Sequence, residues 1–186
     1  IDVPEAAVIT AIDIDHIREL GGTIESVASA KAGIIKAGGD VVYYGNNPIA
    51  ANVFATKCAA VGAKLSIVNF ESLNVKECTI NGAIFDYTVN DSLYENVHIP
   101  LPGTYQSRNC ALVLTTIELL KKKFDISKEA VIEGIASVKW PGRFEVLCRK
   151  PIFIADGGHN PHGIQGTADS IRHHFQNRKI IAIMGV

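Results

Sequence analysis

The stretch VVYYGNNPIAANVFATKCAAVGAKLSIV, residues 41–68, decides the fold class of this chain. Val41–Tyr44 is a short apolar run, which is typical of a strand buried on both faces. Pro48 favours the start of a helix, and Gly62 favours its end. Lys64–Val68 then predicts another buried strand. A strand, a helix and a strand in this order predict a parallel sheet with helices packed on it.

The residues before this stretch extend the same alternation. Residues 7–12 are apolar and predict a first buried strand. A helix is expected from Thr23 to Ile35, with Thr23 as its N-cap and Glu25 in its first turn. Gly38-Gly39 breaks that helix. The chain therefore begins as β-α-β-α-β, and we expect an α/β fold with a mostly parallel sheet.

The pattern changes after residue 70. Val75–Ile80 and Ala83–Val89 are strand-like and flank Asn81-Gly82, a strong hairpin signal. Tyr94–Ile99 predicts a third antiparallel strand. Two helices should follow, one over Arg108–Lys123 and one that Ser127 caps and that runs to about Val138.

The break between Val138 and Lys150 carries Pro141 and Gly142 and is the best candidate for an interdomain linker. A new strand–helix–strand unit should follow, over Ile152–Ala155, His162–Phe175 and Lys179–Met184. We therefore expect two domains, residues 1–142 and residues 143–186.

Composition narrows the function classes. The 186 residues are 47% hydrophobic and 20% charged with a net charge of −1, which suggests neither a nucleic-acid partner nor a membrane partner. No apolar run approaches the roughly 20 residues that span a bilayer. The four cysteines form no C-x-x-C pair, so we expect reduced thiols rather than a zinc or redox site. A cytoplasmic location fits, and no signal peptide is visible.

Two phrases near the C-terminal end point to chemistry. Trp140–Glu145 (WPGRFE) presents Arg143 just after a Pro-Gly turn, and Asp156–Pro161 (DGGHNP) places Asp156 and His159 around two glycines. Glycines between a strand and a helix let backbone N–H groups approach an anion. Both phrases favour the handling of nucleotide phosphate. The alternatives are a solvated linker arginine and a purely structural turn.

Three further residues are candidates. His16 follows the first strand and is either a metal ligand or a surface histidine beside a capping Asp15. Lys31 lies late in a helix among small residues; it either reacts as a neutral amine, for example with carbon dioxide, or interacts with the helix C-terminus. Asn109 near the start of a helix either caps it or faces a ligand. No GxxxxGK[ST] phosphate loop occurs in the sequence.

Taken in order, these segments resemble the folylpolyglutamate synthase/dihydrofolate synthase family of the ATP-dependent Mur ligase superfamily. The resemblance covers essentially the whole chain, and WPGRFE favours the folate branch over the cell-wall branch. The segments that carry it are IT…DH…LGGTI at residues 9–24, KAGIIK at 31–36, GTYQSRN at 103–109, WPGRFE and DGGHNP.

The resemblance implies roles for single residues. His16 corresponds to a magnesium ligand, and Lys31 to a lysine that is carbamylated and helps to organise the metal site. Asn109 corresponds to a contact on the adenine side, and Arg143 to the arginine that reaches the ATP phosphates. Asp156 and His159 correspond to residues at the nucleotide site from the second domain.

The sequence departs from the family pattern at three positions. Asp13 stands where the family often has glycine, Ala30 where glutamate commonly precedes the lysine, and Gly158 in place of an alanine. None of the three coincides with a proposed ligand.

The resemblance also implies a fold and a reaction. The fold would be the second half of a Mur-ligase central ATPase domain, followed by the first β-α-β unit of a Rossmann-like C-terminal domain. ATP and Mg²⁺ would support the addition of glutamate to folates or to dihydropteroate, by a monomer, through an acyl phosphate. The alternatives are a Mur-type amino-acid ligase of cell-wall synthesis and a non-catalytic nucleotide-binding fragment. The family's phosphate loop and a metal-binding glutamate are expected before Ile1, so the isolated chain is expected to be inactive.

Overall fold

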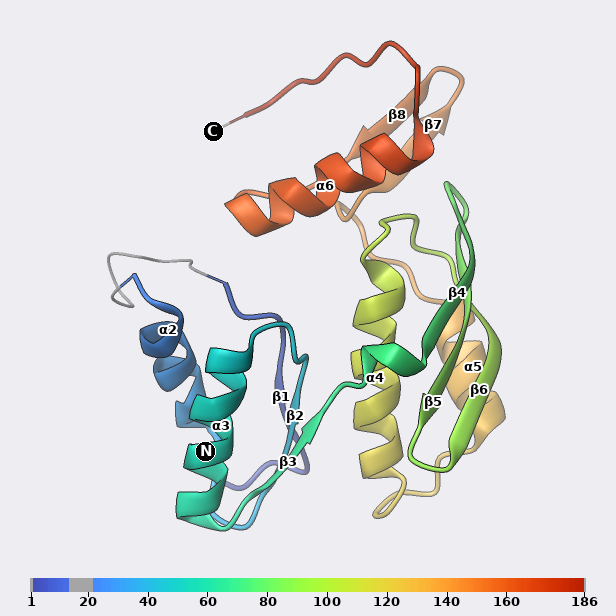
Figure 1. Ribbon diagram of the computed structural model, residues 1–186. Helices are drawn as coiled ribbons and strands as arrows, with labels where there is room; N and C mark the ends of the chain where they lie inside the picture. Colours follow the sequence, from blue (N-terminus) through green and yellow to red (C-terminus); the bar gives the residue numbers. More distant parts are fainter. Residues whose placement is uncertain (1, 14–21, 186) are drawn as a thin grey trace. The chain divides into compact units, whose positions relative to one another are not determined.

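The computed structural model describes residues 2–13 and 22–185, and Figure 1 shows its elements. The chain forms two compact units. The first unit contains Ile1–Leu73, Thr88–Leu93 and Asn109–Ile126, and the second unit contains Asn74–Tyr87, Tyr94–Arg108 and Ser127–Val186. In the described part of the chain, no helix combines the length and the apolar character that a membrane span requires.

The first unit is built on a parallel sheet, as the sequence predicts. Its strands, in the order β1-β2-β3, are β1 (Ala7–Ile9), β2 (Asp40–Tyr43) and β3 (Lys64–Ile67). Both strand pairs are parallel, and Tyr43 lies opposite Ile9 on one side and Ile67 on the other. Val41, Val42 and Tyr43 are at most 1% exposed, because the central strand of a parallel sheet is covered on both faces.

Two helices accompany this sheet and lie side by side in Figure 1. Helix α3 (Pro48–Val61) starts at Pro48 and ends at Gly62, whose φ of +66° is the left-handed conformation that glycine adopts easily. Phe54 of α3 is fully buried, and its ring meets the ring of Tyr43 edge-on at 4.9 Å between centroids. The core of the first unit is therefore apolar and aromatic.

The other helix is shorter than its sequence suggests. Helix α2 (Ile24–Lys31) begins with Thr23 as N-cap, in a capping box with Ser26. The prediction that it reaches Ile35 is wrong, because residues Ala32–Ile34 form a 3₁₀ turn, η1. Gly33 is a poor helix former, and a tightened last turn satisfies terminal carbonyl groups.

The second sheet comes after a short 3₁₀ turn, η2 (Phe70–Ser72). Its strands, in the order β4-β5-β6, are β4 (Leu73–Thr79), β5 (Gly82–Val89) and β6 (Ser92–Ile99). Two residues join each consecutive pair, which only antiparallel strands allow. The predicted hairpin and third strand are confirmed. Gly82 has a φ of +122°, and a Cβ there would lie 2.8 Å from the Cα of Pro100, so this corner requires glycine.

Helices α4 (Gln106–Leu120) and α5 (Lys128–Ala136) agree with the sequence pattern. The Ser127 hydroxyl caps α5 by accepting the N–H of Ala130 at 3.1 Å. All four cysteines are free thiols, as expected. Burial raises the pKa of Cys110 in α4 to about 12, so this thiol stays protonated and packs as a small apolar group.

The C-terminal part contains β7 (Glu145–Arg149), β8 (Ile152–Ala155) and α6 (Pro161–His174). Strand β7 pairs antiparallel with β8, although the sequence predicts a linker there. The predicted strand over residues 179–184 is wrong, since these residues form no regular element. In the described part of the chain no strand pairs with them, and apolar composition alone does not supply the partner that a strand needs. Ile181 is 82% exposed.

Candidate functional site

Arg143 lies in a tight turn of the second unit, residues 142–144, which we call the arginine turn. The Gly142 N–H donates to Oε2 of Glu145 at 2.8 Å. The Gly142 carbonyl accepts the N–H of Gly157 at 2.7 Å. Hydrogen bonds therefore fix the backbone immediately before Arg143 and join the WPGRFE phrase to the DGGHNP phrase.

Phe144 fixes the backbone on the other side of Arg143. Its φ of +51° lies in the left-handed region, which is unfavourable for a bulky side chain and persists only where the surroundings hold it. Phe144 is fully buried, and its ring lies 5.8 Å from the ring of His174. Its N–H donates to Oδ2 of Asp156 at 2.8 Å. The turn is thus rigid at both ends.

Asp156 is the polar centre of this region. Besides the Phe144 N–H on Oδ2, its Oδ1 accepts the N–H of Gly158 at 2.8 Å and the hydroxyl of Thr167 at 2.6 Å. Asp156 therefore joins the end of β8 to the arginine turn and to α6. The sequence predicts a nucleotide contact for Asp156, and the observed contacts are structural.

The side chains of Arg143 and His159 lie at the same turn and are exposed. A guanidinium nitrogen of Arg143 would be 3.9 Å from a Cβ built on Gly157. Nδ1 of His159 lies 3.1 Å from the Gly157 carbonyl. Within the described ranges, Arg143 forms no ion pair with a carboxylate. A cationic group beside a glycine turn and a helix N-terminus is suited to bind an anion.

Asn160 has a local role that the sequence did not predict. Its side chain accepts the N–H of Gly163 at 2.8 Å and caps α6, and Pro161 takes the first helical position. Part of the DGGHNP phrase is therefore a helix start. His159, one residue earlier, is exposed to solvent ahead of that helix.

Tyr105 and Thr167 are the polar residues of this region that sequence reasoning missed. Tyr105 belongs to the GTYQSRN segment, in which the sequence marks Asn109 instead. Burial raises the pKa of Tyr105, the Asp156 carboxylate raises it further, and the Arg143 guanidinium opposes the rise. The Tyr105 hydroxyl thus stays protonated. Thr167 lies within α6, where no sequence signal distinguishes it.

His174 is the last residue of α6. Its Nε2 lies 2.7 Å from the Pro102 carbonyl, and the adjacent His173 ring meets it edge-on. Burial lowers the pKa of His174, the Pro102 carbonyl opposes that shift, and His173 adds to it. The neutral ring, with its proton on Nε2, donates to Pro102.

The first unit contains two other predicted site residues, Lys31 and Asn109. Lys31 is exposed and is the last residue of α2. A cation at this position interacts favourably with the negative end of the helix dipole. Asn109 is exposed and is the fourth residue of α4, past the position that an N-cap occupies. His16 lies outside the described residues.

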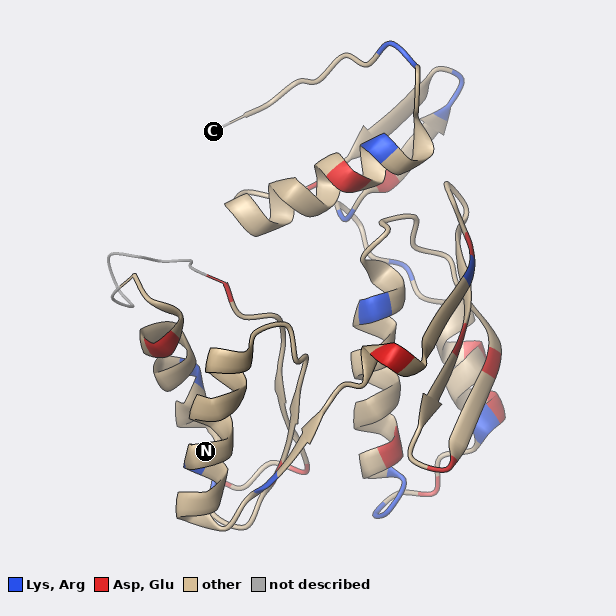
Figure 2. Ribbon diagram, in the orientation of Figure 1, with Lys and Arg blue, Asp and Glu red and all other residues tan. Residues whose placement is uncertain are grey.

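A magnesium site is not complete in the described part of the chain. Residues 2–13 and 22–185 contain no group of three His, Cys, Asp or Glu side chains that could hold a metal ion. Figure 2 shows acidic and basic residues interspersed along these residues, in agreement with the net charge of −1. No reaction step through a metal ion follows from these side chains alone.

Two family models match most of the chain. Residues 2–117 match the model of the Mur ligase middle domain, and residues 142–186 match that of the Mur ligase glutamate ligase domain. The chain belongs to the Mur ligase family.

Two of the relatives that this chain resembles are folate enzymes from bacteria. The folylpolyglutamate synthase of Lacticaseibacillus casei is 33% identical over 188 residues, which cover 98% of this chain and 43% of that protein. The dihydrofolate synthase/folylpolyglutamate synthase of Bacillus subtilis is 34% identical, over 97% of this chain and 43% of the relative. The chain thus spans less than half the length of these relatives.

Solved structures agree with the sequence comparison. A complex of FPGS with AMPPCP and folate has a TM-score of 0.85 and 32% identity, over 94% of this chain and 43% of that one. The Mycobacterium tuberculosis folylpolyglutamate synthase complexed with ADP and AMPPCP has a TM-score of 0.82 and 29% identity, over 92% and 40% of the two chains. The α/β fold expected from the sequence is confirmed.

Proposed function

We propose that the complete protein containing this chain is an ATP-dependent ligase that adds glutamate to folates, to dihydropteroate, or to both. The observation that carries the proposal is the match to folylpolyglutamate and dihydrofolate synthases along almost the whole chain, at 33–34% identity. The fold supports it, because the similar arrangements include an FPGS complex with an ATP analogue and folate. The substrates would be small molecules, and the protein would act as a monomer.

The proposed chemistry has two steps. A carboxylate oxygen of the folate or pteroate attacks the γ-phosphorus of ATP, and ADP leaves with the electrons of the broken P–O bond. The glutamate nitrogen then attacks the carbonyl carbon of the acyl phosphate; phosphate leaves, and the nitrogen loses a proton. The first step is needed because an oxide is too poor a leaving group for direct attack by an amine.

Arg143 has the most direct role in this proposal. Its exposed guanidinium would neutralise charge that develops on the transferred phosphoryl group. The arginine turn supports this role, because hydrogen bonds hold the backbone on both sides of Arg143 before any ligand arrives. His159 and Asp156 would lie on the nucleotide side of the same turn. Asn109 would contact the adenine side.

Lys31 and His16 are proposed to organise Mg²⁺, which would supply charge neutralisation at the phosphates. For this role the neutral Nζ of Lys31 would attack the carbon of carbon dioxide and lose a proton, leaving a carbamate anion. The exposure of Lys31 at the end of α2 allows this reaction. We also propose that the chain divides into two domains, residues 1–142 and residues 143–186.

The test is a ligation assay on the complete protein with ATP, Mg²⁺ and glutamate. Dihydropteroate and a reduced folate are offered in parallel with a UDP-sugar peptide. We expect product only from the pterin substrates. Product only from the UDP-sugar peptide would instead indicate a cell-wall ligase, and ATP binding without product would indicate a non-catalytic nucleotide-binding module.

Arg143→Ala tests the arginine turn in that assay. We expect kcat/KM for ATP to fall about 100-fold, the usual cost of removing a donor that stabilises transition-state charge. Arg149→Ala is the matched control, because Arg149 is also exposed but lies at the far end of β7. Unchanged ligation by the Arg143→Ala protein would contradict the role given to this residue.

Lys31→Ala tests the carbamate. Activity should drop sharply and return in part when a short carboxylate such as acetate is added, since that anion can replace the carbamate. Lys64→Ala, which changes another exposed lysine of the first unit, should behave as wild type. Full activity of the Lys31→Ala protein would remove the carbamate from the mechanism.

A further inference from the structure

The hydroxyl of Thr167 in α6 binds the carboxylate that holds the arginine turn. It lies 2.6 Å from Oδ1 of Asp156 and 3.1 Å from the Gly163 carbonyl, one helical turn earlier. A hydroxyl has a single hydrogen, and the contact with the charged oxygen is the shorter one, in the range of charge-assisted hydrogen bonds. Thr167 therefore donates to Asp156 rather than to its own helix.

The Asp156 carboxylate fits beside Gly158 because that residue has no side chain. A Cβ on Gly158 would lie 2.8 Å from Oδ1 of Asp156 and 3.2 Å from the carbonyl oxygen of Gly163. The Gly158 N–H donates to the same Oδ1 at 2.8 Å. Close packing and the hydrogen bonds from Gly158 and Thr167 therefore define one orientation of this carboxylate.

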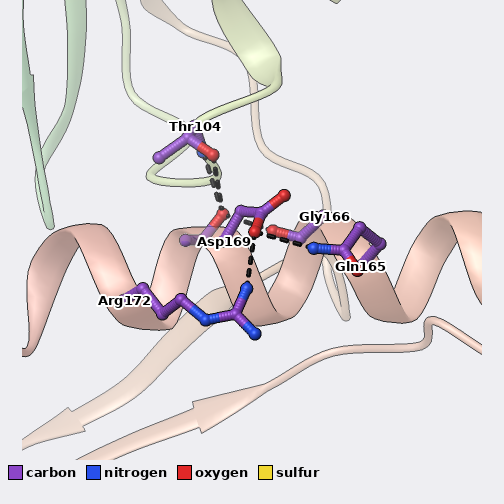
Figure 3. A network of polar contacts seen from close by, with 6 residues as sticks. Thr104, Gln165, Gly166, Asp169 and Arg172 are labelled. Carbon is purple, nitrogen blue, oxygen red and sulfur yellow. Dashed lines mark hydrogen bonds and ion pairs between the residues drawn. The ribbon is translucent and has the colours of Figure 1, made fainter.

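Other contacts of α6 hold Thr167 in place independently of the arginine turn. The Thr104 N–H donates to the hydroxyl of Ser170 at 3.0 Å, and the two hydroxyls lie 3.1 Å apart. Figure 3 shows this contact between the loop of Thr104 and the helix. At the last residue of α6, Nε2 of His174 lies 2.7 Å from the Pro102 carbonyl. These contacts fasten α6 to the loop before α4, so the hydroxyl of Thr167 is a donor with a fixed position.

The other oxygen of Asp156 reaches the arginine turn. Oδ2 accepts the N–H of Phe144 at 2.8 Å. Phe144 directly follows Arg143, and its φ of +51° is a left-handed conformation that persists only where the surroundings hold it. Two hydrogen bonds through one carboxylate thus lead from the Thr167 hydroxyl to the residue beside Arg143.

We propose that Thr167 is a positioning residue for Arg143: its hydroxyl orients Asp156, which holds the arginine turn in the conformation that presents the guanidinium to the phosphates of a nucleoside triphosphate. The inference rests on the proposed function, because it requires Arg143 to contact the nucleotide. Thr167 itself contacts no reacting atom. Its effect is to fix the turn before the nucleotide binds, so that binding does not have to order it.

The test is Thr167→Val in the complete protein, which keeps the branched shape of the side chain and removes the hydroxyl. The Kd of a non-hydrolysable ATP analogue should rise about tenfold, the factor that corresponds to one hydrogen bond to a charged group. The KM for ATP should rise with the Kd, while the KM for glutamate stays the same. Thr167→Ser keeps a hydroxyl and should restore a Kd close to that of wild type.

Ser170→Ala is the matched control on the same helix. Like Thr167, Ser170 has a hydroxyl within hydrogen-bond distance of the carbonyl four residues earlier, but its other partner is Thr104. Because Ser170 is fully buried, the variant should lower the thermal midpoint, while its Kd for the analogue should not change. An equal rise in Kd for Ser170→Ala and Thr167→Val would indicate a general loss of stability and would overturn the inference.

A double-mutant cycle with Arg143 separates positioning from general stability. In an Arg143→Ala background, Thr167→Val should have no further effect on the Kd, because the group that it positions is gone. The same fold-change in both backgrounds, or an unchanged Kd of Thr167→Val beside an intact Arg143, overturns the inference. If Arg143→Ala itself leaves binding and ligation unchanged, the proposed function has failed, and this inference fails with it.

Discussion

Helices α3 and α6 each follow a strand and start with the same local signal, but different interactions hold them in place. In the first unit β2 leads through Asn47-Pro48 into α3, and in the second unit β8 leads through Asn160-Pro161 into α6. In both, the asparagine side chain caps the helix and the proline takes its first position. The same local signal therefore starts both helices.

Beyond the cap, the two helices are held in place by different interactions. Helix α3 buries Ala50, Phe54 and Cys58 against its surroundings. Helix α6 buries only Ser170 and is held by polar contacts of Ser170, Thr167 and His174. Apolar burial tolerates small displacements, whereas hydrogen bonds require defined atom positions. Helix α6 thus gains precision near the turn that presents Arg143, and helix α3 gains stability.

The largest effect should come from the apolar helix of this pair. Phe54→Ala removes a fully buried ring that packs edge-on against Tyr43. We expect the free energy of unfolding to fall by about 3–5 kcal/mol, measured by urea denaturation followed by circular dichroism. Thr56→Ala on the exposed side of α3 is the control and should stay within about 0.5 kcal/mol of wild type. If Phe54→Ala lowers the free energy of unfolding no more than Thr56→Ala does, this core does not hold α3 in place.

The next effect should come from the polar contacts of the second unit. Asp156→Ala leaves the N–H groups of Phe144 and Gly158 and the Thr167 hydroxyl without their acceptor. We expect the free energy of unfolding to fall by about 2–3 kcal/mol. Unfolding can be monitored by the fluorescence of Trp140, the single tryptophan of the chain. Asp156→Asn keeps one acceptor oxygen and should lose less. Equal stability of the Asp156→Ala and wild-type proteins would show that the hydrogen bonds to Asp156 do not stabilise the second unit.

The smallest effects should be shared by both units. Asn47→Ala and Asn160→Ala each remove a helix cap and should each lower the free energy of unfolding by about 1 kcal/mol. The corresponding Asn→Asp variants keep a capping oxygen and should recover most of that loss. If only one of the two alanine variants is destabilised, the two helix starts are not equivalent, and the units already differ at the cap.

Much of the fold follows from local sequence. Pro48 and Gly62 predict the ends of α3, Ser127 predicts the start of α5, and the Asn81-Gly82 dipeptide predicts the hairpin, because each signal acts through nearby backbone geometry. Strand β7 and the irregular residues 179–184 were not predictable in this way. Whether an apolar stretch becomes a strand depends on a partner that local sequence does not reveal.

The same distinction between local sequence signals and distant partners applies to the candidate site. The sequence marks Arg143, Asp156 and His159 through two short phrases, and the structure brings these residues to one turn. It does not mark Thr167 as a partner of Asp156. This contact joins residues 11 positions apart, and no pattern of spacing within an element predicts it.

The sequence by itself determined the α/β class, the helix boundaries set by caps and glycines, and the phrases that carry Arg143 and His159. These depend on backbone preferences and residue chemistry that act over a few positions. Only the tertiary structure decided that Asp156 accepts hydrogen bonds from three groups and that Phe144 adopts a left-handed backbone. Both depend on groups distant in sequence, whose positions are set only when the elements pack together.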